Sequence, residues 1–394
     1  APVVRADGGV TDQRLSENGL LPIEQIPGFD RDLTLYDVGF DASWELDLFG
    51  RTRRAVEAAG ARLDEADALR RGARMTVAAE VARVYLELRG AQRRLEALHE
   101  ALAAARRTRD LVELQVQAGE VAAARLAQVE ADLTALDARV PALEGEIRAT
   151  VLSLGVLMGD LPESELGLLE PGPAGMGLPA PLPLPALPVG ERAELLRRRP
   201  DVRAAERRLA AATAGIGVAT AELFPRLSIG AAGGFQAMTP GDLVRAGSET
   251  WALGPLISWR IFDGGRVRAE IRAAEARTEA AALGYEQAVR EALGDAERAL
   301  TRYRHGLEAL DRQAAAVDAA RRNREYARLR HEAGEAPLFE LLDADRTLAR
   351  ARETYAEIHT RVATGLVALF KALGGGWEGP RSPEGDAPAA RPAG

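Results

Sequence analysis

The sequence LTLYDVGFDASWELDLF, at residues 33–49, decides the fold of this chain. From position 36 onward its even positions are apolar or aromatic, whereas its odd positions are mostly acidic. A period of two places these sets on opposite faces of one β-strand, and the pattern outlasts a usual strand of about 5–6 residues. Strands of a transmembrane β-barrel need one face for lipid and one for a wet lumen. The alternative is an edge strand of a soluble sheet.

An internal repeat brings the same pattern back at residues 251–262, where the odd positions are apolar. Positions 44 and 259 are both tryptophan, and their offset of 215 also relates other matching segments. Because the same offset relates segments of the strands and of the helices, the sequence predicts a tandem duplication of a sub-domain. The aligned segments are Ser43-Trp44 with Ser258-Trp259, Gly50-Arg51 with Gly265-Arg266, Ala118-Gly119-Glu120 with Ala333-Gly334-Glu335, and Gly159 with Gly374.

Residues 51–117 change to the period of a long helix. Apolar or small residues recur at alternating steps of three and four, except for the final step from Ile147 to Leu154, and this is the period of a coiled-coil seam. Gly119 supplies a turn, and Pro141 predicts a kink in the return helix. The seam positions are Val81, Val84, Leu88, Ala91, Leu95, Leu98, Leu102 and Ala105, then Leu126, Val129, Leu133, Leu136, Val140, Leu143, Ile147 and Leu154.

The second copy keeps this register, so we expect two long antiparallel helical hairpins. Taken alone, these helices also fit a soluble antiparallel coiled coil. The predicted organisation is a first β-hairpin at 1–50, a first helical hairpin at 51–159, a Pro-rich connector at 160–190, short helices at 191–222, a second β-hairpin at 223–263, a second helical hairpin at 264–373, and a disordered tail at 374–394.

The composition narrows the function classes. The 394 residues carry a net charge of −8, with Arg interleaved among acidic residues, which argues against nucleic-acid binding. There is no cysteine, and the four histidines are scattered without metal-ligand spacing. Phosphate-binding, nucleophile-elbow and dinucleotide motifs are absent. We therefore expect a protein that is not an enzyme and uses no cofactor or metal.

Four strands from one chain are too few to close a barrel, for which about eight is the minimum. An open sheet edge in lipid leaves backbone groups unpaired at several kcal/mol each. The sequence has no run of 18 apolar residues that could form a transmembrane helix, so only strands could cross the membrane. Because four strands cannot close a barrel, we expect several copies of the chain to share one. Trp44 and Trp259 suit an aromatic girdle at a membrane interface. Alternatively, they are anchors buried between strands and helices.

Several segments together resemble the TolC/OprM family of outer-membrane factors, of the NodT type. They are FDASWELDLFGRTRRAVEAA, EVARVYLELRGAQRRLEAL, LLRRRPDVRAAERRLAAATAGIGVATAELFPRLSI, ISWRIFDGGRVRA and FELLDADRTLARARETY. The resemblance implies a mixed α+β membrane protein, a homotrimer with one twelve-stranded barrel in the outer-membrane lipid and a periplasmic α-barrel. Family members carry two helices before the first strand and often a lipidated cysteine, so we expect this chain, which begins APVVRADGG, to be N-terminally truncated.

The resemblance also implies the sites. A periplasmic gate after the second helix turn would use Phe339, Glu340 and Asp343, with Arg125 as a candidate basic partner; ordinary solvated charges are the alternative. The turns that would meet a periplasmic adaptor hold Gly119, Glu120, Gly334 and Glu335. From the alternation alone, Asp37, Asp41, Glu45 and Asp47 should line the barrel lumen and make it acidic.

The function implied is the passive exit channel of a tripartite efflux pump of a Gram-negative bacterium, for drugs or other small molecules. Its partners would be a periplasmic adaptor and an inner-membrane transporter of the resistance-nodulation-division type. Type I protein secretion is the alternative within this class. A soluble coiled-coil scaffold is the alternative from a different class.

Overall fold

The structure is a computed structural model that describes residues 2–16, 30–169 and 196–375. The chain divides into two compact units, one of Ala1–Asp64 with Glu206–Gly284 and one of Glu65–Ala205 with Tyr285–Gly394. Most of the predicted Pro-rich connector and nearly all of the predicted C-terminal tail lie outside the described residues.

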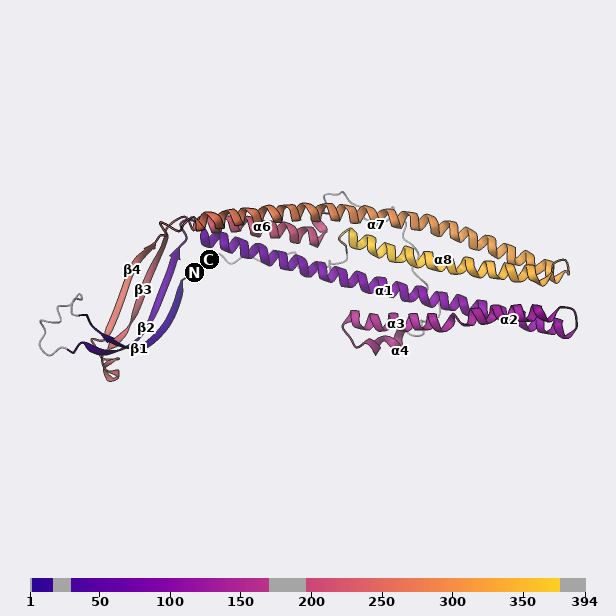
Figure 1. Cartoon of the computed structure of the whole chain (residues 1–394), viewed down its shortest axis with the longest axis horizontal. Coiled ribbons are helices and arrows are strands. Elements are labelled where there is room, and N and C mark those ends of the chain that lie inside the picture. The colour runs from indigo at the N-terminus through magenta and orange to yellow at the C-terminus, as the bar shows by residue number, and fades with distance from the viewer. Residues whose placement is uncertain (1, 17–29, 170–195, 376–394) are drawn as a thin grey trace, which may run out of the picture. The chain divides into compact units, whose positions relative to one another are not determined.

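The first unit contains one antiparallel sheet in the order β1-β2-β3-β4 (Figure 1). Directly paired residues share a face, so the register tells which side chains gather together. Phe40 of β2 pairs with Ala6 of β1 and with Gly233 of β3. Gly233 in turn pairs with Trp251 of β4, so these four residues lie in one row on the same face of the sheet. The strands are β1 (Val3–Arg14), β2 (Asp32–Leu46), β3 (Arg226–Ala237) and β4 (Glu249–Ser258).

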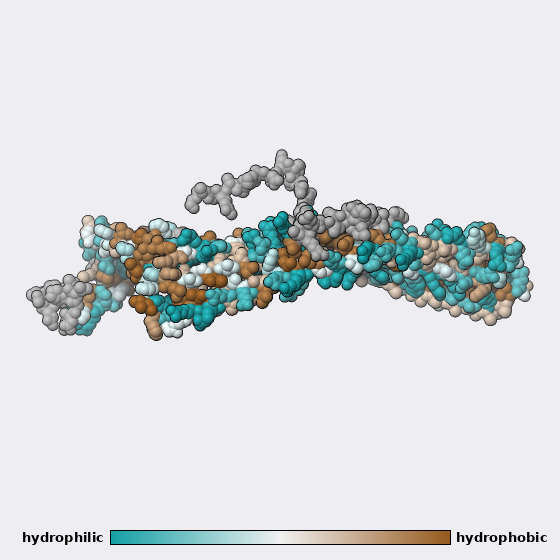
Figure 2. Space-filling view, turned by 90° about the horizontal axis from the view of Figure 1, so that it is seen from above, coloured by the Kyte–Doolittle hydropathy of each residue, from teal (hydrophilic) through white to brown (hydrophobic). Residues whose placement is uncertain are grey.

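The even positions of β2 therefore define one apolar face for the whole sheet. In Figure 2, apolar surface gathers toward the end of the view at which Figure 1 shows the strands. Many of its large side chains are exposed in the single chain, which is unusual for a soluble sheet. The alternation predicted from the sequence is thus confirmed and extended to all four strands. The apolar face carries Val4, Val10, Val38, Phe40, Trp44, Ile229, Phe235, Trp251, Leu253 and Ile257.

The helices confirm the duplication. α1 (Arg51–Gln117) and α7 (Arg266–Glu332) have 67 residues each, and both ends differ by 215. The glycines that end these elements adopt the same left-handed conformation in both copies: φ is 75° at Gly119 and 73° at Gly334. Other side chains resist positive φ, which explains why glycine recurs at these turns. The remaining helical elements are α2 (Ala123–Asp137), α3 (Val140–Met158), η2 (Pro162–Glu165), α4 (Leu166–Leu169), α6 (Pro200–Ala221), η4 (Pro240–Asp242) and α8 (Leu338–Ala372).

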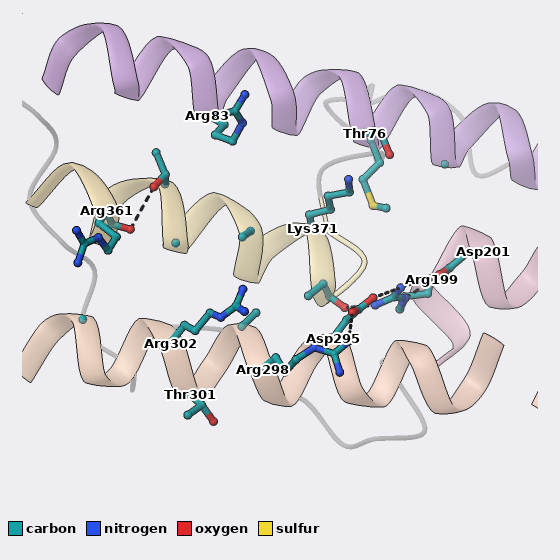
Figure 3. A pocket seen from close by; sticks show the side chains of 18 of the residues that line it. Thr76, Arg83, Arg199, Asp201, Asp295, Arg298, Thr301, Arg302, Arg361 and Lys371 are labelled. Carbon is teal, nitrogen blue, oxygen red and sulfur yellow. Dashed lines mark hydrogen bonds and ion pairs between the residues drawn. The ribbon is translucent and has the colours of Figure 1, made fainter. Parts of the chain in front are cut away.

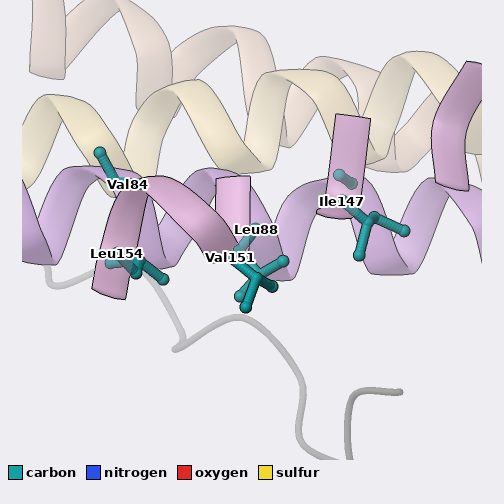
Figure 4. Close-up of a cluster of buried hydrophobic side chains, with 6 residues drawn as sticks. Val84, Leu88, Ile147, Val151 and Leu154 are labelled. Carbon is teal, nitrogen blue, oxygen red and sulfur yellow. The ribbon is translucent and has the colours of Figure 1, made fainter. Parts of the chain in front are cut away.

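The predicted seams form the cores of the second unit. In the first hairpin, α1 and α3 bury a cluster in which Leu88 and Val151 are fully inaccessible (Figure 4). The second hairpin has the same arrangement between α7 and α8, where Tyr303 replaces the leucine at the position equivalent to Leu88. Burying each such side chain contributes about 1.5–3 kcal/mol. The first cluster comprises Val84, Leu88, Ala91, Ile147, Val151 and Leu154, and the second comprises Tyr303, Leu310, Val362 and Leu369.

The two return arms differ at one proline. The first arm is broken between α2 and α3, and Pro141 lies in the first turn of α3. The second arm is the single helix α8, which has Ala356 at the equivalent position. Proline removes a helical hydrogen bond and clashes with the preceding turn, so this substitution explains the difference. Within the described ranges, none of these helices combines the length and apolar character needed to cross a bilayer.

Candidate functional site

The face of the sheet opposite the apolar one carries the predicted lumen residues of β2. Asp37, Asp41 and Glu45 alternate along this face. Arg5 of β1 lies directly opposite Asp41, and Arg51 donates hydrogen bonds of 3.1 and 3.0 Å to the two oxygens of Glu45. The structure therefore brings these three carboxylates to one polar face and gives two of them a basic neighbour.

Asp47, the fourth predicted lumen residue, takes part in capping a helix. It lies beyond β2, which ends at Leu46. Its carboxylate accepts hydrogen bonds from the backbone N–H groups of Thr52, at 2.9 Å, and Arg53, at 2.8 Å. These N–H groups lie in the first turn of α1, where the helix itself offers them no acceptor. Desolvation raises the pKa of Asp47, but these hydrogen bonds outweigh it and hold the pKa below its ordinary value. Asp47 therefore caps the start of α1, one residue beyond the strand that carries the other three carboxylates, and its place in a barrel lumen stays a prediction.

The two predicted interface tryptophans are exposed side chains. Trp44, which is 48% exposed, projects from the apolar face of β2. Trp259, which is 57% exposed, follows β4, and its Nε1–H donates a hydrogen bond of 3.1 Å to the carbonyl of Leu223. Ile261 and Phe262 next to it are more exposed still. Within the single chain, neither tryptophan is the buried anchor considered as the alternative.

The predicted gate residues lie at the start of α8, just after the turn at Gly334. The guanidinium of Arg125 lies 5.1 Å from the ring centroid of Phe339, which is the distance of a cation–π contact. Glu340 forms an ion pair of 2.8 Å with Arg330 of α7. Asp343 is exposed. The structure thus joins the two gate candidates Arg125 and Phe339 across the two hairpins.

Sequence reasoning missed a set of ion pairs between the two hairpins. Arg352 of α8 pairs with Glu100 of α1 at 3.2 Å, Arg139 pairs with Glu353, and Arg346 pairs with Asp132. A single surface pair contributes little, typically 0–1 kcal/mol. The three ion pairs and the cation–π contact nevertheless act together. They connect the first helical hairpin to the second. Arg330 was also missed, because nothing in the heptad pattern distinguishes it from other exposed arginines.

The predicted adaptor-contacting turns occupy the ends of the two hairpins. Gly119 and Gly334 close them in the left-handed conformation, and Glu120 and Glu335 are exposed beside them. Among the described residues, no group of three or more His, Asp or Glu side chains is placed to hold a metal ion. The chemically distinctive features of this chain are therefore two faces of a sheet and the joined ends of two hairpins.

Comparison with known proteins agrees with this architecture. The family model described as outer membrane efflux protein matches residues 1–160 and 192–375. The chain is 33% identical over 353 residues to the pyoverdine export outer membrane protein OpmQ of Pseudomonas putida, covering 89% of this chain and 72% of that protein. It is also 33% identical over 352 residues to the outer membrane protein OprJ of Pseudomonas aeruginosa, covering 88% and 71%. The solved structure of the outer-membrane channel OprN matches with a TM-score of 0.84 at 37% identity, covering 96% of this chain and 82% of that one.

A four-stranded sheet with one lipid-compatible face and two long helical hairpins in the same chain are the elements of an outer-membrane channel that extends into the periplasm. The chain belongs to the outer membrane efflux protein family. The predicted family, fold class, localisation and efflux function are therefore confirmed, and the soluble scaffold is set aside. Members of this family are channel components, and its efflux-pump members imply an adaptor and an inner-membrane transporter as partners.

Proposed function

We propose that three copies of the chain close one twelve-stranded barrel and act as the passive, non-enzymatic exit duct of a tripartite pump. The observation that carries this proposal is the sheet order, because within the described part of the chain β1 and β4 each pair on one side only. Pairing β4 of one copy with β1 of the next removes the open edges that lipid does not tolerate. Eight strands leave little room for solute, so a ring of twelve suits a channel better.

Disulfide trapping tests this assembly, because the chain has no native cysteine. One cysteine placed on β1 and one on β4 should link neighbouring copies, giving covalent dimers and closed trimers on a non-reducing gel. A pair within the known register, Val10→Cys with Tyr36→Cys, is the control and should link only within one chain. If no β1–β4 combination gives more intermolecular product than this control, the proposed ring is rejected.

The polar face of the sheet is proposed to line the lumen, and the apolar face to meet lipid, with Trp44 and Trp259 at the membrane interface. Three copies would place three sets of Asp37, Asp41 and Glu45 around one axis. Rings of carboxylates favour cations in a pore. Replacing Asp37 and Asp41 by Asn should therefore lower the cation-over-anion permeability ratio in a planar bilayer. An unchanged ratio would contradict the lumen assignment.

We further propose that the hairpin ends form the periplasmic gate, with Phe339, Glu340 and Asp343 at the constriction. The ion pairs between the hairpins support this, because opening requires such contacts to break together. Removing the positive charge of one pair with Arg139→Gln should raise the open-channel conductance, and the swapped pair Arg139→Glu with Glu353→Arg should restore the closed level. Arg94→Gln is the matched control, because Arg94 pairs with Glu146 inside the first hairpin.

The turns at Gly119-Glu120 and Gly334-Glu335 are proposed to meet the adaptor of a transporter of the resistance-nodulation-division type. Reversing Glu120 and Glu335 to Arg should abolish cross-linking to the adaptor while the conductance of the purified channel stays the same. Loss of both would indicate misfolding instead. The solute is proposed to be a small molecule selected by the transporter, since relatives at 33% and 30% identity are named for pyoverdine export and for toluene efflux.

A further inference from the structure

The groove between α1, α7 and α8 is held together by ion pairs of the chain itself. It has a volume of about 1360 Å³, and Arg199 lies between Asp201, at 2.6 Å, and Asp295, at 3.3 Å (Figure 3). In Figure 3, Arg302 and Arg361 project from different helices and do not converge on one point. The polar face of the sheet differs from this groove, because its shape depends on two pairs of glycines.

The glycines of each pair lie directly opposite each other on the polar face. Gly39 of β2 pairs with Gly234 of β3, and Gly230 of β3 pairs with Gly254 of β4. The first pair is on this face because Gly39 has the odd position of Asp41, and the second because Gly230 opposes another odd position of β2. The two pairs therefore allow a matched comparison within one face.

Only the first of these two pairs is closed to a side chain. A Cβ atom added at Gly234 would lie 2.6 Å from the Cα atom of Gly39 and closer still to a carbonyl oxygen of β2. A Cβ atom at Gly39 would lie 2.9 Å from the carbonyl oxygen of Gly233. At Gly230 or Gly254 it would meet nothing within 4 Å. The blocking atoms belong to the backbone, so they cannot rotate away as a side chain can.

These distances indicate that the sheet bends sharply between β2 and β3. In a regular antiparallel pair, opposite Cα atoms are about 4.5–5.5 Å apart and side chains stand roughly perpendicular to the sheet. Here the Cβ directions of Gly39 and Gly234 turn toward the partner strand, as they do where the polar face is concave. On the apolar face, a Cβ atom at Gly233 would meet nothing within 4 Å, as expected for the convex side.

We propose that the bend at Gly39 and Gly234 sets the width of the channel at the level of Asp37 and Asp41, and so selects solutes by size. This rests on the proposed assignment of the polar face to the lumen. Because no side chain fills the concave bend, the wall of β1 and β2 can approach the wall of β3 and β4. The first wall carries the carboxylates of this face, whereas the polar-face positions of β3 and β4 carry none. A narrow passage therefore keeps solutes close to the carboxylates.

Dipolar EPR spectroscopy in lipid nanodiscs tests the bend in the parent sheet. Spin labels at Asp7→Cys and Thr250→Cys lie in the row of Gly39 and Gly234, because Asp7 pairs with Gly39 and Thr250 with Gly234. A flat sheet would hold the Cα atoms of residues 7 and 250 three strand spacings apart, about 14 Å.

The comparison row carries labels at Val3→Cys and Gly254→Cys, which are also three spacings apart on the same face. Labelled chains are mixed with an excess of unlabelled chains, so that distances within one chain are measured. The distance in the row of Gly39 should be the shorter one. Equal distances in the two rows would overturn the bend without any substitution at the glycines.

Alanine substitutions then test what the bend does. Gly39→Ala and Gly234→Ala should lengthen the distance between residues 7 and 250, because van der Waals contact of about 3.5–4.0 Å requires a movement of roughly 1 Å at the bend. Gly230→Ala, which adds a methyl group to the same face without a clash, is the matched control and should leave this distance unchanged. The same change in all three variants would contradict the proposal.

Neutral polymers test the width of the channel. In planar bilayers, poly(ethylene glycol) of graded size added from the barrel side should enter up to a larger size in Gly39→Ala and Gly234→Ala than in the parent protein or in Gly230→Ala. A longer EPR distance with an unchanged polymer limit would reject the role of the bend in selection. Failure of the lumen assignment would be detected separately, by an unchanged permeability ratio in the Asp37 and Asp41 variants.

Discussion

Gly90 of α1 lies directly against Thr360 of α8, and this is a point of very close approach between the two hairpins. A Cβ atom at position 90 would lie 2.7 Å from Thr360 Cγ2 and 3.0 Å from its Cβ, with Oγ1 closer still. Such distances are not tolerated between real atoms, and the blocking atoms belong to a short, branched side chain. Glycine is required here for packing, not for a turn.

Gly90→Ala is therefore expected to destabilise the protein by about 1–3 kcal/mol, the usual cost of overpacking. The measurement is the thermal unfolding midpoint of the purified protein. Gly60→Ala and Gly145→Ala are matched controls, because a Cβ at either position meets nothing within 4 Å. These helical positions should instead gain about 0.5–1 kcal/mol each. Thr360→Ala should partly rescue Gly90→Ala, and an additive result would show that the two positions do not interact.

The second prediction concerns Pro141 and its equivalent Ala356. Exchanging these two residues should make the first return arm continuous and break the second. Pro141→Ala should join α2 to α3, as the equivalent Ala356 does within α8. Amide hydrogen exchange of the segment around residues 138–142 should then slow. The reverse change, Ala356→Pro, should break α8 and cost about 3 kcal/mol. Unaltered exchange around position 141 after the proline is removed would mean that packing, not proline, causes the break.

Much of the fold was predictable because local geometry leaves clear marks on a sequence. The left-handed turns require glycine, so Gly119 and Gly334 mark the hairpin ends in both copies. The seam residue Leu88 and its equivalent Tyr303 mark the buried helix faces. These patterns depend only on nearby residues, and each of them occurs in both copies of the repeat.

The features that the sequence does not predict depend on contacts between distant residues. The side-chain alternation continues to Asp47, yet β2 ends one residue earlier, where its pairing with β3 ends at Leu46 and Leu227. The alternation cannot show whether a carboxylate beyond that point faces a lumen or caps the next helix. Likewise, Arg139 and Glu353 are 214 positions apart. Their pairing depends on how two hairpins lie side by side, which no periodicity within one hairpin encodes.

The contact of Arg125 with Phe339 gives a third prediction, for the gate. Phe339→Ala should remove both the ring and its cation–π attraction, worth about 0.5–1 kcal/mol at an exposed site, and should raise the frequency of channel opening in planar bilayers. Arg125→Ala should have a similar effect, and Arg125→Lys should retain most of the closed-state occupancy because the cation is kept. If Arg125→Ala leaves gating unchanged while Phe339→Ala alters it, the ring acts by filling the constriction and not through this contact.

Asp263 gives the fourth prediction, on pH. Its carboxylate accepts the backbone N–H groups of Val267 and Gly265, both at 2.9 Å, at the start of α7. These hydrogen bonds lower the pKa of Asp263 in the folded protein. A lowered folded pKa means that the stabilisation is fully present above the unfolded value of about 3.9 and is lost as the pH falls through the folded pKa.

Asp263→Asn keeps a capping oxygen without the charge, so it should lower the thermal midpoint at pH 7, and the difference from the parent protein should shrink at pH 3. Asp318→Asn, at an exposed aspartate on the same helix with no ion pair among the described residues, should show no such convergence. A difference that stays constant or grows on acidification would show that the charge of Asp263 does not stabilise the start of α7.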